Sequence, residues 1–498
     1  MARILLALLL AFVAAPAAAY SVRLTWQASI GPIAAANYNV YRNGVKIGTV
    51  PVPGFVDTNL PGGVTYTYSV TAVAGGGAES APTAASVTTL NGNYHYVRPG
   101  GIGLANGSSW ANAWDVTAIQ WGSVAAGDTV WIAGGTYSGN IRLYDSGSNG
   151  GPVAGAGAGQ NQLVYIRWAS DATNHYDAGW NIAWDAQVIV TGIGLGGQYA
   201  VVDGQVPNGI FVFLNDCPSQ NCSGIGTAGP TTGLTIRYVE VSGPCGSSGC
   251  AMQGDPRSID LNNFNGSDYD VQTNLTIQHA NLHGACNGIW SAKSVNLIVE
   301  YSRIADIIET IVGCHENVII NQNTTGTLRF SEITNWATEG ILSCPTNACN
   351  SSWDVYGNVW HDPKATGSFP RVVATQNGVG GVYKFYNNTF VNIPFLCYSD
   401  ENSGAGFGAG SAAFNNLYIG NNFAACGFPA AVAEDYAYSD QALTETHGQG
   451  SAANPFISSS NFRLKFNTNA GIILAPPYNT DFDGYLRSTW SRGAYEFR

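Results

Sequence analysis

Charged and amide side chains between Arg257 and Arg371 have the types and the spacing that chemistry requires. Each stands two residues before a β-branched aliphatic residue, in a pattern that recurs along the chain. The pairs are Arg257 before Ile259, Asn287 before Ile289, Glu309 before Ile311, Glu339 before Ile341 and Arg371 before Val373. Such a column of mixed charge is unexpected in a chain with only 10% charged residues. We therefore take this stretch as the candidate functional region.

The two carboxylates of this column admit three interpretations. If successive repeats stack about 4.8 Å apart, Glu309 and Glu339 cannot both ionise freely, so the pKa of one is raised unless a cation lies between them. Such a pair suits a glycoside hydrolase, as acid and as nucleophile or base. With Asn287, the same carboxylates offer oxygen ligands for Ca²⁺. The third interpretation is a structural ladder in which Arg257 and Arg371 are the counter-ions.

A second column lies just beyond the same strand. Lys293 and His315 occupy matching positions in what the spacing predicts to be consecutive repeats. Both types of side chain can serve as acids and bases, and a resemblance described below implies Lys293 as a base and His315 as an acid or second base.

The same region carries candidates for substrate binding. Aromatic rings beside polar groups suit the apolar face and the hydroxyl groups of a sugar, and basic side chains would attract an acidic polymer. The predicted substrate-binding residues are Arg257, Arg303, Arg371, Trp290, Trp336 and Trp360.

The elements that must position these side chains are short strands. Apolar runs recur irregularly, each followed by a polar turn and a second short apolar run, at residues 234–236, 275–277, 297–299, 328–330, 353–355 and 383–385. A constant strand–turn–strand unit with loop insertions is typical of a solenoid. The fold class we predict is all-β, with a right-handed parallel β-helix over residues 91–498.

Residues 20–90 form a different unit. Alternating residues 22–26, a hairpin with its turn at Asn43-Gly44, and alternating residues 66–73 predict a small β-sandwich. Trp26, the stretch 38–44, Leu60 with Tyr66, and Ser80 followed by Pro82 make this unit resemble a fibronectin type III domain. The resemblance implies a spacer or weak binding module without catalytic chemistry.

Both ends of residues 91–498 carry a second resemblance. Residues 96–98, 107–114 and 127–137, and then 454–456, 462–464, 481–487 and 493–496, are similar to the first and last coils of secreted bacterial β-helix proteins of the pectate-lyase-like superfamily. The resemblance implies the fold. The superfamily contains polysaccharide lyases, glycoside hydrolases, esterases and non-catalytic surface proteins, so the fold leaves the activity open.

Lys293 stands in a Lys-Ser-x-x-Asn context that resembles lyases of the chondroitinase B and alginate lyase type. The resemblance implies a lysine base. His315 stands where those enzymes carry arginine, and Cys286, Asn287 and Gly288 replace their acidic calcium ligands. The resemblance is therefore partial, and Ca²⁺ is the only cofactor the sequence suggests.

The N-terminus predicts secretion. Arg3, an apolar run over residues 4–13 and the small residues Ala17, Ala18 and Ala19 are typical of a signal peptide that is cleaved after Ala19. In a secreted chain, ten cysteines read as disulfides. Three pairs with one spacing are expected to close small loops, with zinc as the alternative: Cys217/Cys222, Cys245/Cys250 and Cys344/Cys349. The pairing of the others stays open: Cys286, Cys314, Cys397 and Cys426.

The net charge of the chain limits the kinds of partner that it can bind. A net charge of −12 without a basic cluster argues against nucleic acid, and no later segment is long and apolar enough to span a membrane. We expect an extracellular polysaccharide as partner and predict a lyase that cleaves a uronate-containing glycan by β-elimination. The alternatives are a hydrolase of a neutral glycan and a non-catalytic adhesin, glycan-binding or fibre-forming protein. The oligomeric state stays open.

Overall fold

The computed structural model separates into two compact units, Met1–Gly135 with Ala154–Ala186 and Thr136–Val153 with Gln187–Arg498. It describes residues 12–15, 19–24, 26–27, 35–61, 64–88, 93–143, 163–170, 179–214, 222–244, 255–264, 267–308, 316–364, 370–393, 398–400, 406–420 and 433–498. The domain boundary after residue 90 stays a prediction.

The first unit begins with two antiparallel sheets. One has the order β1 (Phe12–Ala15), β2 (Ala19–Leu24), β5 (Phe55–Pro61), and the other β4 (Val45–Val50), β3 (Asn37–Arg42), β6 (Thr65–Val73), β7 (Thr83–Thr88). Asn43 and Gly44, both at positive φ, make the turn of the predicted hairpin. Trp26, Tyr38 and Tyr68 are buried between the strands, as a β-sandwich requires. β1 lies within the predicted signal peptide, whose cleavage stays a prediction.

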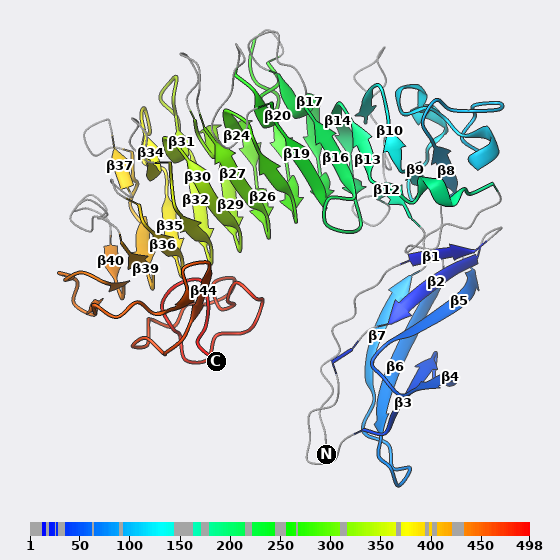
Figure 1. The fold of residues 1–498 in the computed structure, drawn as a ribbon, viewed down its shortest axis with the longest axis horizontal. Helices are drawn as coiled ribbons and strands as arrows, with labels where there is room; N and C mark the ends of the chain where they lie inside the picture. Colours follow the sequence, from blue (N-terminus) through cyan, green and yellow to red (C-terminus); the bar gives the residue numbers. More distant parts are fainter. Residues whose placement is uncertain are drawn as a thin grey trace. The chain divides into compact units, whose positions relative to one another are not determined.

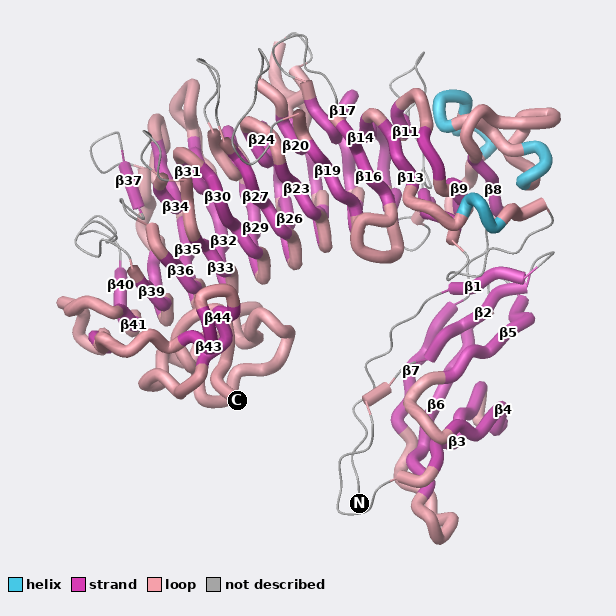
Figure 2. Tube along the Cα trace, viewed as in Figure 1, coloured by secondary structure: helices cyan, strands magenta, loops and turns pink. Residues whose placement is uncertain are grey.

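The same unit continues with three parallel strands in the order β8 (Tyr94–Val97), β9 (Thr129–Ala133), β12 (Val164–Ala169). Short 3₁₀ helices accompany them, as Figure 2 shows: η1 (Trp110–Asn112), η2 (Val116–Ala118), η3 (Trp121–Ser123) and η6 (Ile182–Trp184). The fully buried Trp110 packs with Tyr96 and Trp131 in the core of this region.

The second unit is built from three parallel sheets whose strands alternate along the chain (Figure 1). Sheet 1 runs through β11 (Asn140–Arg142), β14 (Gly192–Gln198), β17 (Ser223–Thr232), β20 (Arg257–Leu261), β24 (Asn287–Ala292), β28 (Ile319–Gln322), β31 (Glu339–Ser343), β34 (Arg371–Thr375) and β37 (Tyr398–Asp400), with β21 (Gln272–Thr273) and β25 (Ser294–Val295) beside it. Sheet 2 runs through β15 (Ala200–Asp203), β18 (Thr235–Arg237), β22 (Thr276–Gln278), β26 (Leu297–Glu300), β29 (Thr325–Arg329), β32 (Ser352–Tyr356), β35 (Tyr383–Tyr386), β38 (Ala412–Phe414) and β40 (Ala433–Asp435).

Sheet 3 completes each coil. It runs through β13 (Val188–Val190), β16 (Ile210–Phe213), β19 (Val239–Ser242), β23 (Asn281–His283), β27 (Arg303–Ile307), β30 (Glu332–Trp336), β33 (Val359–His361), β36 (Thr389–Val391), β39 (Leu417–Ile419), β41 (Tyr438–Ser439) and β42 (Gln449–Gly450), and β10 (Gly135–Thr136) also belongs to it. One strand from each sheet makes a coil. The predicted fold, a right-handed parallel β-helix that follows a small β-sandwich along the chain, is confirmed.

The register inside sheet 1 corrects one step of the sequence alignment. Ile259 pairs with Ile289, and Ile341 pairs with Val373, as predicted. The residue between Ile289 and Ile341 is Ile319 rather than Ile311. The predicted strand position at Ile311 is therefore wrong, and residues 309–315 lie outside the described part of the chain.

Buried asparagines fix the turn between sheets 2 and 3. Asn358, Asn388 and Asn416 are fully or almost fully buried and occupy equivalent positions in consecutive coils. Asn388 Oδ1 accepts the Asn358 backbone N–H at 3.1 Å, and Asn388 Nδ2 donates to the Val355 carbonyl at 2.9 Å. The repeated amide bonds satisfy backbone groups that the turn would otherwise leave buried without partners.

The C-terminal segment covers one end of sheet 3. The hairpin of β43 (Phe456–Ser458) and β44 (Asn461–Leu464) packs Phe456 and Phe462 onto apolar side chains of sheet 3, including Val359 and Leu417. Among the described residues, no helix is long and apolar enough to cross a membrane.

Candidate functional site

A groove lies on the outer face of sheet 1. Because alternate strand residues face opposite sides, the residues next to the inward isoleucines point outward: Trp290, Ile320 and Leu342, in register on three consecutive coils. Ile320 and Leu342 pack together with Trp290 as an apolar floor. With Asp255, Asn287, Pro345 and Gln376 these residues line a groove of about 260 Å³.

Arg257 binds two carboxylates at the Asp255 end of this groove. Its Nη2 lies 2.7 Å from Asp255 Oδ2 and its Nη1 lies 2.7 Å from Asp260 Oδ2. The guanidinium carbon stands 4.0 Å from the centre of the Trp290 ring. The Arg257 side chain is only 5% exposed, so the predicted substrate-binding arginine is held in place by two carboxyl groups.

The carboxyl group of Asp260 has a raised pKa. Burial raises the pKa of its carboxyl group, and the nearby Asp255 adds to the rise, while Arg257 opposes it. An aspartic acid with a raised pKa keeps its proton to a higher pH than an exposed one. The sequence analysis missed both Asp255 and Asp260, although their positions two before and three after Arg257 were visible.

The register rearranges the predicted polar column. Asn317, two residues before Ile319, takes the position expected for Glu309, which lies outside the described residues. Both the backbone N–H and the Nδ2 of Asn317 approach Asn287 Oδ1, at 3.2 and 3.4 Å. Glu339 is 7% exposed and pairs in register with Arg371. The position in register next to Glu339 is therefore that of Asn317, and the predicted stacking of Glu309 against Glu339 falls on a residue outside the described part of the chain.

Two of the three predicted calcium ligands, Asn287 and Glu339, lie in the described part of the chain, and calcium binding stays a prediction. Asn287 uses its amide oxygen for Asn317 and donates its Nδ2 to Asp255. Within the ranges that the structure describes, no group of three His, Cys, Asp or Glu side chains is arranged to hold a metal ion.

Lys293 lies at the end of β24, the strand that carries Trp290. Its ammonium group forms an ion pair with Asp268, which lowers the pKa of the Asp268 carboxyl. Because Ala292 pairs with Gln322, the residue that matches Lys293 in the next coil is Asn323. His315, the predicted match, lies outside the described residues.

Three predicted binding residues lie elsewhere. Trp336 and Trp360 are fully buried, with ring centres 5.6 Å apart, so the prediction that they present rings to a sugar is wrong. Arg303 is exposed on sheet 3 beside Asn281, whereas Arg257 lies on sheet 1. Of the predicted tryptophans, Trp290 alone lines the groove.

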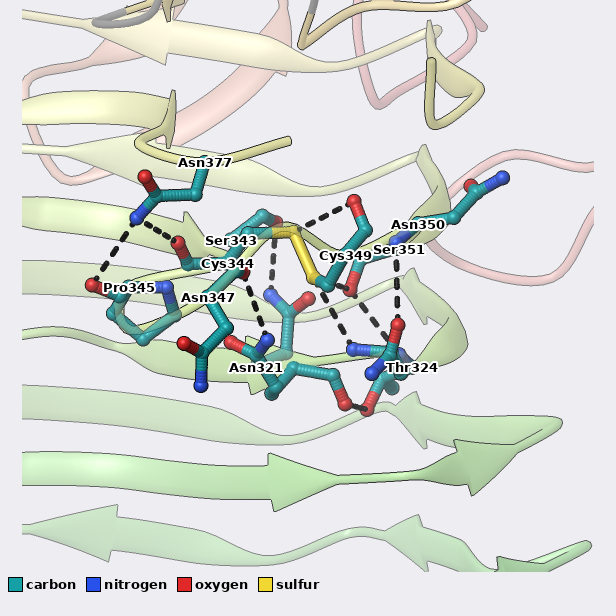
Figure 3. The surroundings of a disulfide bond; sticks show 12 residues. Asn321, Thr324, Ser343, Cys344, Pro345, Asn347, Cys349, Asn350, Ser351 and Asn377 are labelled. Atoms are coloured by element: carbon teal, nitrogen blue, oxygen red, sulfur yellow. Dashed lines mark hydrogen bonds between the residues drawn. A yellow bond between two sulfur atoms is a disulfide. The ribbon is translucent and has the colours of Figure 1, made fainter. Parts of the chain in front are cut away.

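The disulfide between Cys344 and Cys349 closes a loop at the edge of the groove (Figure 3). Pro345 inside this loop lines the groove. Asn377 Nδ2 donates to the Cys344 carbonyl at 3.0 Å, and Gln322 Nε2 donates to the Asn347 carbonyl at 3.0 Å. Neighbouring coils therefore hold the loop, as predicted for this cysteine pair.

The other cysteines are only partly described. Cys222 and Cys286 are disulfide-bonded. The remaining predicted positions lie outside the described residues: Cys217, Cys245, Cys250, Cys314, Cys397 and Cys426. The two further predicted pairs, Cys217/Cys222 and Cys245/Cys250, stay predictions.

Comparison with known proteins gives short sequence matches. No protein-family model matches the chain. A poly(3-hydroxybutyrate) depolymerase of Ralstonia pickettii is 40% identical over 105 residues, which are 18% of this chain and 21% of that protein. Chitinase Chi52 of Paenibacillus xylanexedens is 42% identical over 74 residues, 15% of this chain and 14% of that protein. The chain thus spans a small part of the curated relatives it matches.

Solved structures match over more of the chain at low identity. Pectate lyase Pel9A is 14% identical, with 82% of this chain and 96% of that chain covered and a TM-score of 0.48. The complex of XylC with xylose is 10% identical, with 81% and 98% covered and a TM-score of 0.42. From its own sheet order and register, the chain is a right-handed parallel β-helix protein, preceded along the sequence by an antiparallel β-sandwich.

Proposed function

We propose that the chain degrades a polysaccharide that lies along the groove of sheet 1. The observation that carries this proposal is the cluster at one end of the groove, where Arg257 lies over Trp290 and also binds Asp255 and Asp260. Indole rings beside hydrogen-bonding groups suit the two sides of a sugar ring. Paired carboxyl groups, of which Asp260 has a raised pKa, suit acid–base cleavage of a glycosidic bond.

The chemistry that this cluster favours is hydrolysis. Asp260, whose carboxyl pKa is raised by burial, donates its proton in its acid form to the glycosidic oxygen as the bond to that oxygen breaks. Asp255, bound to Arg257, removes a proton from the water that attacks the sugar carbon. The water supplies the hydroxyl group of one product, and the proton from Asp260 completes the other.

β-Elimination of a uronate-containing glycan is the second candidate, favoured by Lys293, which directly follows the strand that carries Trp290. As a base, Lys293 would take the proton from the carbon next to the uronate carboxyl group, and the leaving sugar oxygen would depart with the electron pair. The ion pair with Asp268 occupies the Lys293 ammonium group, so this route requires that pair to open. Ca²⁺ belongs to this candidate, because Arg257 is already neutralised by two carboxylates.

A polysaccharide panel tests these proposals. We expect new reducing ends from a neutral glycan without the ultraviolet absorbance of unsaturated uronates. Absorbance on a uronate polymer that is lost in Lys293→Ala, and that depends on added Ca²⁺ over a chelator, would select elimination. Binding of a glycan without either product would instead select the non-catalytic alternative and overturn the proposed activity.

The curated matches add limited support. The relatives reported above are named for the breakdown of polymers, one of them a chitinase and another a poly(3-hydroxybutyrate) depolymerase. Because the matched stretches are short and the polymers differ, these relatives support polymer breakdown in general and select no substrate.

A further inference from the structure

The side chains on the outer face of sheet 3 change from polar to mainly apolar along the coils. One row of residues in register begins with polar side chains, Glu240, Asn281, Arg303 and Glu332. The same row continues with Val359, Thr389, Leu417 and Tyr438. The C-terminal segment packs on the apolar end of the row. The polar part of the row ends at Glu332, where the C-terminal segment begins to cover sheet 3.

A cavity of about 350 Å³ lies at that boundary, lined by Glu332 of β30 and by residues of the C-terminal segment. Figure 2 shows β43 and β44 drawn next to β33, whose Val359 also lines the cavity. A cavity of this size is at the lower end of ligand-binding pockets, so it fits one or two sugar rings.

The polar groups of the cavity are held by ion pairs. Glu332 Oε1 lies 2.9 Å from His361 Nε2, and the other ring nitrogen of His361 lies 2.9 Å from Asp362. Arg463 binds Asp483 through two contacts, at 2.6 and 3.1 Å. Glu332 is 42% exposed and Arg463 is 49% exposed. Both therefore keep polar atoms free to face a ligand.

Aromatic rings supply the apolar part of the lining. Phe482 and Tyr495 stand with ring centres 5.0 Å apart, and the Arg463 guanidinium lies 4.9 Å from the Tyr495 ring. Phe462 packs against the His361 ring at 4.7 Å. Rings combined with a carboxylate, a guanidinium and the amide of Asn461 are suited to a ligand with both apolar faces and hydroxyl groups.

Charge decides between ligand classes. Arg463, which lines the cavity, already has Asp483 as its acidic partner, and His361 beside the cavity has Glu332 and Asp362. An anionic ligand would meet these carboxylates, and a cation would meet Arg463. A neutral polyhydroxyl compound avoids both costs.

We propose that this cavity is a second saccharide-binding site, which takes one or two rings of a neutral glycan. The polar row of Arg303, Asn281 and Glu240 continues from the cavity along sheet 3 and would contact the following sugars of a longer chain. The site lies on a different sheet from the catalytic groove, so it binds glycan independently of the proposed catalysis.

The test fills the cavity without touching the groove. Ser460 is exposed and lines the cavity, while its neighbour Ser459 is exposed and does not. Both substitutions, Ser460→Trp and Ser459→Trp, are made in the full chain that also carries Trp290→Ala, which weakens the groove. Calorimetry with a panel of neutral disaccharides, namely cellobiose, maltose, xylobiose and diacetylchitobiose, measures the affinity.

We expect at least one disaccharide to bind the Trp290→Ala protein, Ser460→Trp to lower that affinity at least tenfold, and Ser459→Trp to leave it unchanged. Glu332→Gln, which keeps the shape of the side chain, should also weaken binding. Absence of binding by every disaccharide, or equal affinity in all variants, would overturn the second site. Because the readout is binding, a failure to find any degrading activity would leave this result intact.

Discussion

Asp260 is the side chain on which the hydrolytic mechanism depends. It is buried beside Arg257, and its pKa is raised from the usual value for aspartate. We expect Asp260→Asn to lower kcat by a factor of about 10² to 10⁴ with little change in KM. In the wild type, activity should fall as pH rises through the raised pKa, because the acid loses its proton.

A matched control for Asp260 is Asp268, which pairs with Lys293 outside the groove lining. Asp268→Asn should leave hydrolysis unchanged. If Asp268→Asn altered kcat as strongly as Asp260→Asn, the role of acid could not be assigned to Asp260, and elimination through Lys293 would become the better candidate.

Trp290 is expected to bind the sugar ring and to take no part in the chemical step. Trp290→Ala removes the ring beneath Arg257 and the contact with a sugar face, which is worth about 1 kcal/mol. We expect KM to rise roughly fivefold, and Trp290→Phe to recover part of the loss. Steady-state kinetics on soluble oligosaccharides measure this, and an unchanged KM in Trp290→Ala would remove the ring from the substrate path.

His361 links pH to the contact between sheet 3 and the C-terminal segment. Burial lowers the pKa of its imidazole, but the contacts with Glu332 and Asp362 outweigh burial, and the pKa is raised from 6.5. A raised pKa means stabilisation that is complete below 6.5 and lost as pH rises through the folded-state value. Thermal unfolding should therefore show a midpoint that falls with pH above 6.5, and the slope should flatten in His361→Asn. A wild-type slope that is equal to the variant slope would contradict this.

At the scale of elements, the asparagine ladder is the feature that the stacking of coils depends on. Asn388→Ala removes bonds to the Val355 carbonyl and to Asn358 and leaves these buried groups without partners, at a cost of about 3 kcal/mol. Chemical unfolding followed by circular dichroism measures the change. The exposed Asn469→Ala serves as control, and equal stabilities of the two variants would show that the ladder contributes little.

The Cys344–Cys349 loop is an element of the groove itself. Replacing both cysteines by serine removes a short cross-link worth about 2 kcal/mol and frees Pro345 at the groove edge. We expect a lower unfolding temperature together with a higher KM. A lower stability with an unchanged KM would mean that the loop stabilises the coils but does not contribute to substrate binding.

Two stretches of sheet 1 show how much of the strand alignment can be predicted from the sequence. The spacing from Ile259 to Ile289 and from Ile341 to Val373 was aligned correctly, because short apolar runs there have no competitor. Between Ile289 and Ile341 two apolar runs compete, one containing Ile311 and one containing Ile319. Parallel strands pair through their backbones, so side-chain pattern alone cannot choose the run, and the position of Glu309 depended on that choice.

The same limit applies to the tryptophans. Trp290 and Trp336 look alike in sequence, yet one lies on the outer face of sheet 1 and the other inside the coil. In a two-residue alternation, a shift of one residue exchanges the inner and outer faces. Asp255 and Asp260 were missed because nothing in their local sequence shows that both side chains reach Arg257.

For the whole molecule, charge separates the two candidate activities. The chain carries a net charge of −12, and the groove cluster of Asp255, Arg257 and Asp260 adds one cation to two anions. A uronate polymer would be repelled at low ionic strength, where the Debye length is about 30 Å, and less at physiological salt, where it is about 8 Å. We expect kcat/KM on a neutral glycan to stay constant between these conditions, and any activity on a uronate polymer to rise with salt. A fall with salt on the uronate polymer would mean that cations outside this cluster attract it, and would restore elimination as the leading candidate.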